Sequence, residues 1–520
     1  MCGFAVAIDW PEARTVVASL IDGIVSRGDV TDPQYAPQAD VAMCTRRLRI
    51  VDRENATQPQ FSFDEKLAVS FNGEIYNYRE LRAELQAMGV PFKTDSDTEV
   101  LVNALRVWGH HALAKISGMY AFVAYEPATG QFLAARDPFG IKPLYVMQSG
   151  SGFLFCSEIR PLLNTVEQGD VLALPPGFLL TQRTCAPFPS PVLALPESFQ
   201  PTNRRHLDAL MLDAVSAHIP PDLPFAIMFS GGIDSTLVAH YARQIRPDAP
   251  GYFVGGHESV DYPFAAAYAE ATGFDLRHIP FEPHADDTFA LLAEAVVATE
   301  SFEPALVRGA VVSLAVSKAI QKDNIRVALC GEGADELFCG YAPLEKAFGI
   351  DETYGRAMRE ECLGLMNRIS LQRVDRCSMH HNLETRVPFL DPQIANYARS
   401  LQASDLVRDG LGKAALRDLF DLYPKDLPRL IRDRSKILFS EGAGLKASSD
   451  EYAWDERFED EISDLEFVDG LKRYAGFNLH NKEELHYLRL LHEGMDVFRM
   501  PQLRGRARIT VAPPAATRQA

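Results

Sequence analysis

The chain contains eight cysteines but no Cys-x-x-Cys pair, which argues against a structural zinc site and favours reduced thiols. It also contains no charged segment followed by an apolar core, and no apolar run long enough to span a bilayer. We therefore expect neither a signal peptide nor a membrane segment. The formal net charge of −18 disfavours general binding to nucleic acid or to anionic membranes. Together these absences predict a cytoplasmic globular protein.

The length and composition predict at least two domains. With 520 residues, of which 47% are hydrophobic and 23% charged, the chain can bury more than one core. Residues 184–203 contain five prolines and no sustained periodicity, which is typical of a linker. We therefore predict one domain at residues 1–183, a second at 204–505 and a flexible tail at 506–520.

The first candidate for chemistry is the second residue, in the opening Met-Cys-Gly-Phe. Removal of Met1 would leave Cys2 with both a thiol and a free α-amine. An α-amine has an unperturbed pKa of about 7.7–8.0, so it can accept the proton of the thiol. Cys2 would then combine nucleophile and base at the start of a strand predicted for residues 4–8. Alone, a cysteine at this position is a weak indication.

Three polar segments follow, at residues 46–52 (RRLRIVD), 72–77 (NGEIYN) and 95–99 (DSDTE). The Asn-Gly pair comes after the apolar strand predicted for residues 67–71, which favours a turn there. Asp97 is placed to be the N-cap or a first-turn acid of the amphipathic stretch at residues 100–108. Neither interpretation excludes a functional role.

In their order and spacing, these segments resemble the glutaminase domain of class II glutamine amidotransferases, as does RDPFGIKPLY at residues 136–145. The resemblance runs from residue 1 to about 165. It implies an α+β fold of the N-terminal-nucleophile hydrolase type, with stacked antiparallel sheets and helices. It also implies that Cys2 hydrolyses glutamine.

Glutamine chemistry agrees with the residue types that the resemblance assigns. A guanidinium at Arg47 can bind a carboxylate with two hydrogen bonds. Asp97 suits the substrate ammonium, with Glu74 or a nearby backbone carbonyl as alternatives. The Asn72 side chain and the Gly73 N–H are donors for the oxyanion that forms when Cys2 attacks. The implied glutamine-binding residues are Arg47, Leu48, Ile50, Val51, Asn72, Gly73, Glu74 and Asp97.

The second half alternates apolar strands with longer helical stretches, which predicts an α/β domain with a parallel sheet. A strand at residues 225–229 leads into SGGIDS at 230–235, and a helix is expected from about Thr236. This is not a Walker A loop, because GxxxxGK[ST] is missing. Glycines that admit close backbone approach, followed by a helix N-terminus, favour a phosphate-binding loop.

A second strand, at residues 325–329, leads into the acidic segment CGEGADE at 330–336. Clustered carboxylates near a phosphate loop can hold Mg²⁺, although a solvated acidic turn is the simpler alternative. SGGIDS at residues 230–235 resembles the pyrophosphate loop of the ATP pyrophosphatase superfamily, which implies ATP and Mg²⁺. By that resemblance Asp234 and Asp335 hold the metal, and Glu332 and Lys436 act in catalysis. The implied ATP-binding residues are Phe229, Ser230, Gly231, Gly232, Asp234, Ser235, Val254, Cys330 and Gly331.

The order of the two halves, with ETRVPFLD at residues 384–391, resembles glutamine-dependent asparagine synthetases over residues 1 to about 450. The resemblance implies that ATP adenylates a carboxylic acid, and that ammonia from glutamine travels through the protein to the acyl-adenylate. Aspartate is the default acceptor, giving asparagine, AMP and pyrophosphate. A different carboxylic acid is the main alternative, and a catalytically reduced scaffold is a weaker one. Whether the chain forms a homodimer stays open.

The acceptor segment departs from the family pattern. Where the family commonly has Glu-Thr-Tyr-Asp-Val-Thr-Thr-(Ile/Val)-Arg, this chain has ESFEPALVR at residues 300–308. The implied acceptor residues are therefore Glu300, Ala305, Leu306 and Arg308. Two threonines have become Ala305 and Leu306, and the Glu-Gln that often follows Lys436 is Ile437-Leu438. We therefore predict a more apolar acceptor pocket, which puts aspartate in doubt.

Overall fold

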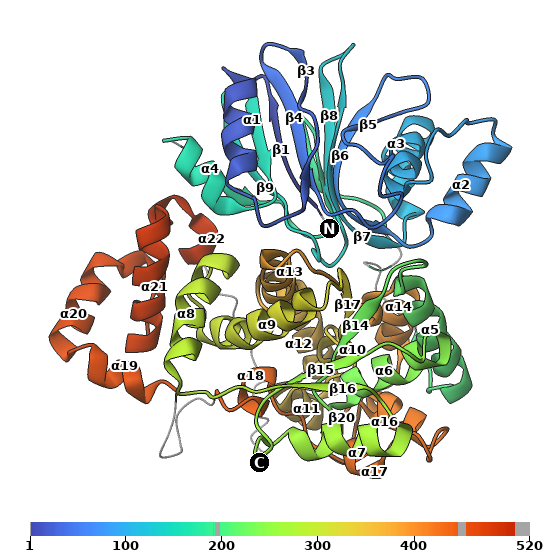
Figure 1. The fold of residues 1–520 in the computed structure, drawn as a ribbon, viewed down its shortest axis with the longest axis vertical. Helices are drawn as coiled ribbons and strands as arrows, with labels where there is room; N and C mark the ends of the chain where they lie inside the picture. Colours follow the sequence, from blue (N-terminus) through green and yellow to red (C-terminus); the bar gives the residue numbers. More distant parts are fainter. Residues whose placement is uncertain (1, 168, 191, 193–197, 446–453, 505–520) are drawn as a thin grey trace, which may run out of the picture.

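The computed structural model describes residues 2–167, 169–190, 192, 198–445 and 454–504, and the chain forms two halves (Figure 1). The N-terminal half, drawn in blue to teal, contains two facing sheets with helices outside them. The remainder contains a third sheet surrounded by helices. Met1 and the predicted flexible tail at 506–520 lie outside the described residues.

Both sheets of the N-terminal half are antiparallel. The first has the spatial order β11 (Leu172–Ala173), β9 (Tyr145–Ser149), β10 (Gly152–Cys156), β1 (Cys2–Ile8), β4 (Val41–Arg47) and β2 (Val30–Thr31), with β3 (Tyr35–Gln38) also on β4. The second has the order β13 (Cys185–Pro187), β12 (Phe178–Leu180), β8 (Gln131–Arg136), β7 (Gly118–Glu126), β6 (Ala68–Ile75) and β5 (Gln60–Phe61).

Strand β1 shows how the layers are built, because alternate side chains enter different cores. Phe4, Val6 and Ile8 lie in the core between the two sheets, whereas Ala5 and Ala7 lie in the core beside α1. Helices α1 (Ala13–Asp22) and α4 (Ile159–Thr165) cover the first sheet. Helices α2 (Tyr78–Ala87) and α3 (Asp97–Trp108), followed by η1 (Gly109–Ala114), cover the second. The predicted fold with stacked antiparallel sheets is confirmed.

The predicted Asn-Gly turn is wrong, because both residues lie inside strand β6. Asn72 pairs with Ala121 and Gly73 with Tyr120 of β7. A Cβ atom at Gly73 would lie 2.1 Å from the carbonyl oxygen of Met119. The glycine therefore permits a close approach of two strands, which is the other common reason for glycine in this setting.

The predicted first-turn acid at Asp97 is confirmed. Helix α3 begins at Asp97, and the preceding Ser96 is its N-cap. The Ser96 hydroxyl accepts a hydrogen bond from the Thr98 N–H at 3.0 Å. Asp97 is itself buried and accepts a hydrogen bond from the Ile75 N–H at 3.0 Å, which ties the helix start to strand β6.

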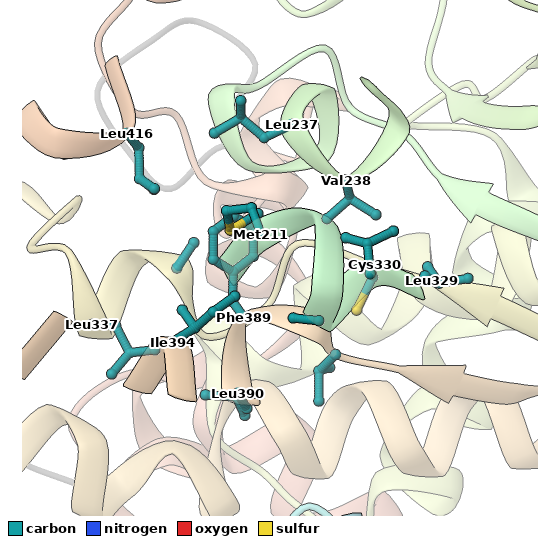
Figure 2. Close-up of a cluster of buried hydrophobic side chains, with 14 of the residues drawn as sticks. Met211, Leu237, Val238, Leu329, Cys330, Leu337, Phe389, Leu390, Ile394 and Leu416 are labelled. Atoms are coloured by element: carbon teal, nitrogen blue, oxygen red, sulfur yellow. The ribbon is translucent and has the colours of Figure 1, made fainter. Parts of the chain in front are cut away.

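The sheet of the second half is parallel throughout, as predicted, with the order β16 (Leu276–Ile279), β15 (Gly251–Val254), β14 (Phe225–Met228), β17 (Val327–Leu329) and β18 (Glu384–Arg386). Both faces are covered, as is usual for parallel sheets. On one face Leu329 lies in a cluster with Leu237 and Val238 of α6 (Ile233–Ile245) and Met211 of α5 (Arg204–His218), which Figure 2 shows in part.

Helix α6 begins three residues earlier than predicted, at Ile233, so Asp234 and Ser235 belong to its first turn. An acid is favourable there because the first turn carries unpaired N–H groups and a positive dipole end. The other helices of five or more residues are α7 (Tyr262–Thr272), α8 (Asp286–Thr299), α9 (Pro304–Lys322), α11 (Ala342–Ile350), α12 (Glu352–Leu365), α13 (Ser370–His380), α14 (Pro392–Ser400), α16 (Ala414–Phe420), α19 (Glu456–Glu461), α20 (Asp464–Arg473) and α21 (Lys482–Gly494).

Shorter elements complete the second half. They are α10 (Ala334–Leu337), η3 (Met366–Arg368), η4 (Pro388–Leu390), α15 (Ala403–Leu406), β19 (Val407–Arg408), β20 (Leu411–Gly412), α17 (Arg429–Arg432), α18 (Phe439–Gly442), η5 (Ala475–Phe477), η6 (Val497–Arg499) and α22 (Pro501–Arg504). Within the predicted linker, β13 extends the second sheet and Asn203 is the N-cap of α5. Among the described helices, none combines the length and apolarity that crossing a membrane requires.

Candidate active sites

The first candidate site forms where β1, β4 and β6 lie together. Strand pairing places Cys2 opposite Arg47. The Cys2 backbone N–H donates to the Asn72 Oδ1 atom at 3.0 Å. Asn72 Nδ2 is buried and has no hydrogen-bond partner among the described residues. The Asn72 amide is therefore oriented by Cys2, and its nitrogen is left available to an oxyanion.

The glutamine-binding residues predicted from the sequence surround a small cavity of about 30 Å³ beside Cys2. Its wall includes Cys2, Arg47, Leu48, Ile50, Val51, Gly73, Glu74 and Asp97. Arg47 is oriented by Asp32, with 3.1 Å between its Nε and the carboxylate, and it also donates to the Arg53 carbonyl at 3.1 Å. Asp32 had no role in the sequence analysis, since a single aspartate distant in sequence gives no motif.

Burial raises the pKa of the Cys2 thiol to about 11, against the opposing effects of a backbone hydrogen bond from Leu48 and the charge of Arg47. The thiol is therefore protonated at neutral pH, and attack on an amide requires a group that accepts its proton. The predicted proton acceptor is the α-amine that removal of Met1 would expose, and Met1 lies outside the described residues.

The second half of the chain supplies two buried charges to this site, Glu384 and Arg386 of strand β18. Arg386 bonds Glu74 at 3.0 Å and Glu384 at 2.7 Å, and Glu384 lines the cavity beside Cys2. Burial raises the pKa of Glu74 to about 8, although the charge of Arg386 opposes this shift. Neither Glu384 nor Arg386 has a role predicted from the sequence. The sequence feature that could have indicated a role is a pair of charged residues at the two ends of a short strand in a covered sheet.

A buried ionic network joins the two halves. Asp375 of α13 contacts Arg27 at 2.9 Å and Lys142 at 3.3 Å, and both cations belong to the N-terminal half. Burial acts to raise the pKa of Asp375, but Arg27 and Lys142 outweigh it and lower that pKa to about 2. Because a buried charge that loses its partner is costly, this network fixes how the halves dock.

Two of the four predicted acceptor residues lie elsewhere. Glu300 pairs with Arg376 at 2.9 Å and accepts the N–H groups of Ile159 and Arg160 at the start of α4. Arg308 pairs with Glu483 of α21. The structure therefore gives both residues structural partners and separates them from Ala305 and Leu306, which line a large cavity described below. A buried ionic side chain needs a partner, and that need accounts for both Glu300, which directly follows α8, and Arg308 of α9.

A hydrogen bond joins the first and last residues of the predicted phosphate loop. The Ser230 N–H donates to the Ser235 hydroxyl at 3.2 Å. Gly231 has φ +69°, and a Cβ atom there would lie 2.6 Å from the Ala265 nitrogen, so this position requires glycine. Arg434, which follows much later in the chain, donates a hydrogen bond of 3.1 Å to the Gly231 carbonyl oxygen.

Two lysines bridge the predicted metal ligands. Lys413 Nζ lies 2.7 Å from Asp234 and 2.5 Å from Asp335, and Lys436 Nζ lies 2.7 Å from Asp335. Burial alone would raise the pKa of Asp335, but Lys413 and Lys436 lower it to about 2. The charges of Asp335 and Asp234 outweigh desolvation and raise the pKa of Lys436. Lys413 was not predicted as a site residue from the sequence, because a single lysine far from both acidic segments forms no motif with them.

Two small cavities, of about 40 and 70 Å³, adjoin the phosphate loop and share Ser230, Asp234, Lys436 and Phe439. Six predicted ATP-binding residues line them, namely Ser230, Gly232, Asp234, Ser235, Cys330 and Gly331. Glu332 lies in the same wall and pairs with Arg373. Two other predicted ATP-binding residues have side chains in cores: Phe229 packs against Tyr268 and Phe274, and the Val254 side chain lies on the opposite face of the sheet. The predicted contact of Val254 with ATP is through backbone groups.

A third, much larger cavity of about 710 Å³ opens next to these two. It shares Arg373, Lys436 and Phe439 with the 70 Å³ cavity, so it continues from the predicted nucleotide site. Its wall includes Ala305 and Leu306 of α9 and Leu438 of the segment after Lys436. The 70 Å³ and 710 Å³ cavities therefore adjoin each other and could hold a nucleotide and a second molecule side by side.

Comparison with known proteins places both halves. Residues 1–187 match the family described as "Glutamine amidotransferase domain", and residues 206–368 and 351–487 match the family described as "Asparagine synthase". An Arabidopsis thaliana protein named asparagine synthetase [glutamine-hydrolyzing] 2 is 29% identical over 455 residues, covering 84% of this chain and 74% of the relative. A Zea mays asparagine synthetase [glutamine-hydrolyzing] is 27% identical over 520 residues, covering 95% and 86%.

Among solved structures, a glutamine phosphoribosylpyrophosphate amidotransferase from B. subtilis is 18% identical with a TM-score of 0.32, covering 54% of this chain and 66% of that chain. That likeness is too distant to carry an argument. The match to the asparagine synthase description alone spans more than half of the 520 residues. The chain belongs to the asparagine synthase family.

Proposed function

We propose that this protein is a glutamine- and ATP-dependent ligase that forms an amide from a carboxylic acid. One observation carries the proposal: two separately built polar sites occur in one chain, and each contains the residues that its half of the reaction needs. The buried network of Asp375, Arg27 and Lys142 holds the two sites in one body. A half-active scaffold would have no need of both sets.

In the first half-reaction, the Cys2 thiol attacks the side-chain amide of glutamine and forms a thioester, and ammonia leaves. Asn72 Nδ2 and the Gly73 N–H are the donors for the oxyanion. Arg47, held by Asp32, binds the substrate carboxylate, and Asp97 receives its ammonium group. Water then hydrolyses the thioester and restores the thiol.

In the second half-reaction, the acceptor carboxylate attacks the α-phosphorus of ATP and pyrophosphate leaves. Lys436 and Lys413, which lie at the phosphate loop, stabilise the negative charge of the phosphates. Ammonia attacks the carbonyl carbon of the acyl-adenylate and AMP leaves, and Glu332 is placed to accept a proton from the attacking nitrogen. The ammonia passes through the interior, because at neutral pH ammonia in water is mostly protonated and unreactive.

Asp234 and Asp335 suit a magnesium ion. Asp234 Oδ1 is buried and has no hydrogen-bond partner among the described residues, and hard carboxylate oxygens are the ligands that Mg²⁺ prefers. When bound, the ion would neutralise phosphate charge and orient the leaving pyrophosphate. Lys413 already pairs with Asp234 and Lys436 with Asp335, so both lysines would lie beside the carboxylates that hold the ion.

The acceptor remains to be assigned within this reaction. Aspartate is the default, because the curated relatives are named asparagine synthetases. Amidation of a different carboxylic acid is the second candidate, and the cavity of about 710 Å³ beside Lys436 favours it. We also propose that residues 1–183 and 204–505 are the two catalytic domains.

The proposal is tested by measuring glutamate and pyrophosphate separately. Purified protein with glutamine should release glutamate, and protein with ATP, Mg²⁺, ammonium salts and an acceptor should release pyrophosphate. Glu294→Gln is a suitable control, because Glu294 lies outside both sites and contacts only His380 and His381 among its ion pairs with described residues. Release of glutamate without any acceptor-dependent pyrophosphate would contradict the ligase assignment.

A further inference from the structure

The cavity of about 710 Å³ is mostly apolar. Its size lies within the range of roughly 300–1,000 Å³ that encloses drug-sized ligands. Helices α9, α11, α12, α13 and α18 form it together with η3. Its apolar wall comprises Ala305, Leu306, Ala342, Pro343, Leu344, Leu365, Met366, Ile369, Leu438 and Phe439. A wall of this kind favours an apolar ligand body.

The two cations of the cavity mark the end where a carboxylate would react. Arg373 and Lys436 lie at the boundary with the predicted nucleotide site, since both residues line the two cavities. Phe439 is shared in the same way, and the Arg373 guanidinium lies 5.8 Å from its ring centre. An acid with its carboxylate at this boundary would extend its body away from ATP, into the apolar part.

Aspartate fits this wall poorly. Besides the reacting carboxylate it carries a second carboxylate and an ammonium group, and each needs a partner when buried. Both cations of the wall already have acidic partners, Glu332 for Arg373 and Asp335 for Lys436. Glu336 accepts hydrogen bonds from Tyr341 at 3.0 Å and Ser370 at 3.2 Å, and its Oε2 atom has no partner among the described residues. The Glu336 and Glu441 carboxylates of the wall could therefore receive an ammonium group. Both cations among the described lining residues are already paired, so a second carboxylate finds no free cation there.

We infer that the acceptor is a carboxylic acid with an apolar body larger than that of aspartate, such as an aryl or medium-chain aliphatic acid. This inference rests on the proposed function, because the cavity has meaning as an acceptor site only if the adjoining site binds ATP. The body occupies the space between α9, α11 and α13, and the carboxylate lies between Arg373 and Lys436. A single hydrogen-bond donor near the carboxylate would meet Glu336.

The inference is tested with stable mimics of the acyl-adenylate. Three 5′-O-sulfamoyladenosines are compared by calorimetry, with N-acetyl, N-(β-aspartyl) or N-(3-phenylpropanoyl) groups in place of the acyl group. All three share the nucleotide, so differences in affinity report the cavity. Since each buried methylene contributes about fourfold in affinity, we expect the phenylpropanoyl compound to bind at least tenfold tighter than the other two.

A pair of variants tests whether the tighter binding of the phenylpropanoyl compound arises in this cavity. Ala305 is exposed at the second position of α9, so Ala305→Trp can enter the cavity mouth without disturbing the core. We expect this variant to lose the phenylpropanoyl advantage and to keep its affinity for the acetyl compound. Ala83→Trp, at an exposed position of α2, is the matched control and should behave as the unchanged protein.

The outcomes separate the inference from the function on which it rests. Tightest binding of the aspartyl compound, or equal binding of all three, would overturn the apolar acceptor and leave the nucleotide site intact. Failure of all three to bind would overturn the nucleotide site itself, and the inference with it. A phenylpropanoyl advantage that persists in Ala305→Trp would place the body of the acid outside this cavity and would also overturn the inference.

Discussion

The two candidate active sites differ in how they limit what can bind. The cavity beside Cys2 measures about 30 Å³ and contains Arg47, Glu74 and Asp97 in its wall, so it can match a small charged amino acid group by group. The cavity beside Lys436 measures about 710 Å³ and is lined mainly by aliphatic side chains. Polar sites reject molecules that leave their groups unpaired, whereas apolar sites discriminate mainly by size and shape.

This difference suggests that the two halves are constrained unequally. Every predicted glutamine-binding residue lies at the first site, and buried partners such as Asp32 and Arg386 hold the charged ones. Of the predicted acceptor residues, only Ala305 and Leu306 lie at the second cavity, and neither can form a side-chain hydrogen bond. On the proposed function, the ammonia-producing half is therefore built for one substrate, and the acceptor half has a pocket that suits a different kind of acid.

The largest expected effect is the loss of glutamine use in Cys2→Ala. Removing a nucleophile should lower glutaminase activity by a factor on the order of 10⁴ or more. Pyrophosphate release with ammonium salts should remain within about twofold, because Cys2 is not part of the acceptor site. Parallel assays of glutamate and pyrophosphate check this, with Cys185→Ala as an exposed cysteine control. Loss of both activities in a folded variant would refute the separation of the sites.

A second, opposite loss is expected for Asp234→Asn. This change removes a carboxylate that lies 2.7 Å from Lys413, and it should lower acceptor-dependent pyrophosphate release by a factor on the order of 10²–10³. Glutamate release should persist. Asp433→Asn, on the exposed side of the loop before Lys436, is the control. Normal turnover of ATP by Asp234→Asn would show that the loop at residues 230–235 does not bind the nucleotide.

Arg386→Ala tests whether the second half supports the glutamine site. The change leaves Glu74 and Glu384 buried without their common cation, and breaking such a buried pair costs about 3–5 kcal/mol in the free energy of unfolding. We also expect glutaminase activity to fall roughly tenfold. Arg326→Ala is the matched control, because Arg326 pairs with Asp29 at 3.0 Å across the same halves but is partly exposed, and should cost about 1 kcal/mol or less. Equal effects from the two variants would argue against a special role for Arg386.

The smallest effect concerns pH at the acceptor cavity. Burial, together with the charges of Asp335 and Glu332, raises the pKa of Glu336 to about 7. Glu336 is therefore neutral below pH 7, and above it carries a negative charge that repels the acceptor carboxylate. With Arg373 and Lys436 paired to acids, kcat/KM for an apolar acid should fall a few-fold as pH rises through 7. Glu336→Gln should flatten this profile, and Glu345→Gln should not, because Glu345 accepts the Gly412 N–H and does not line this cavity. A profile that keeps its shape in Glu336→Gln would assign the titration to another group.

Much of the fold was predictable from periodicity and from the resemblance. Alternation along β1 and the covered strands of the parallel sheet are local features, and local pattern is sufficient to indicate them. The Asn-Gly pair at residues 72–73 was misassigned, because a turn and a close strand contact both use glycine. Only the position of the Met119 carbonyl, far along the chain, distinguishes the two.

The site residues also divide into those indicated by local sequence motifs and those placed by tertiary contacts. Cys2, Arg47, Asp97 and the loop at residues 230–235 belong to short motifs, so the sequence indicates them. Arg386 and Lys413 act at sites built by segments more than a hundred residues away. Glu300 and Arg308 stand in the acceptor segment, but tertiary partners on α13 and α21 engage them. Contacts of this kind depend on packing, which no window of sequence contains.

One measurement tests the contrast between the two sites most directly. The protein is given glutamine, ATP and Mg²⁺ with an equimolar mixture of aspartate, 3-phenylpropanoate and a series of linear acids from butanoate to octanoate, and the amides are identified by mass. Our account predicts amides of the larger apolar acids, with yield rising along the linear series and asparagine a minor product. Efficient and exclusive formation of asparagine would contradict it.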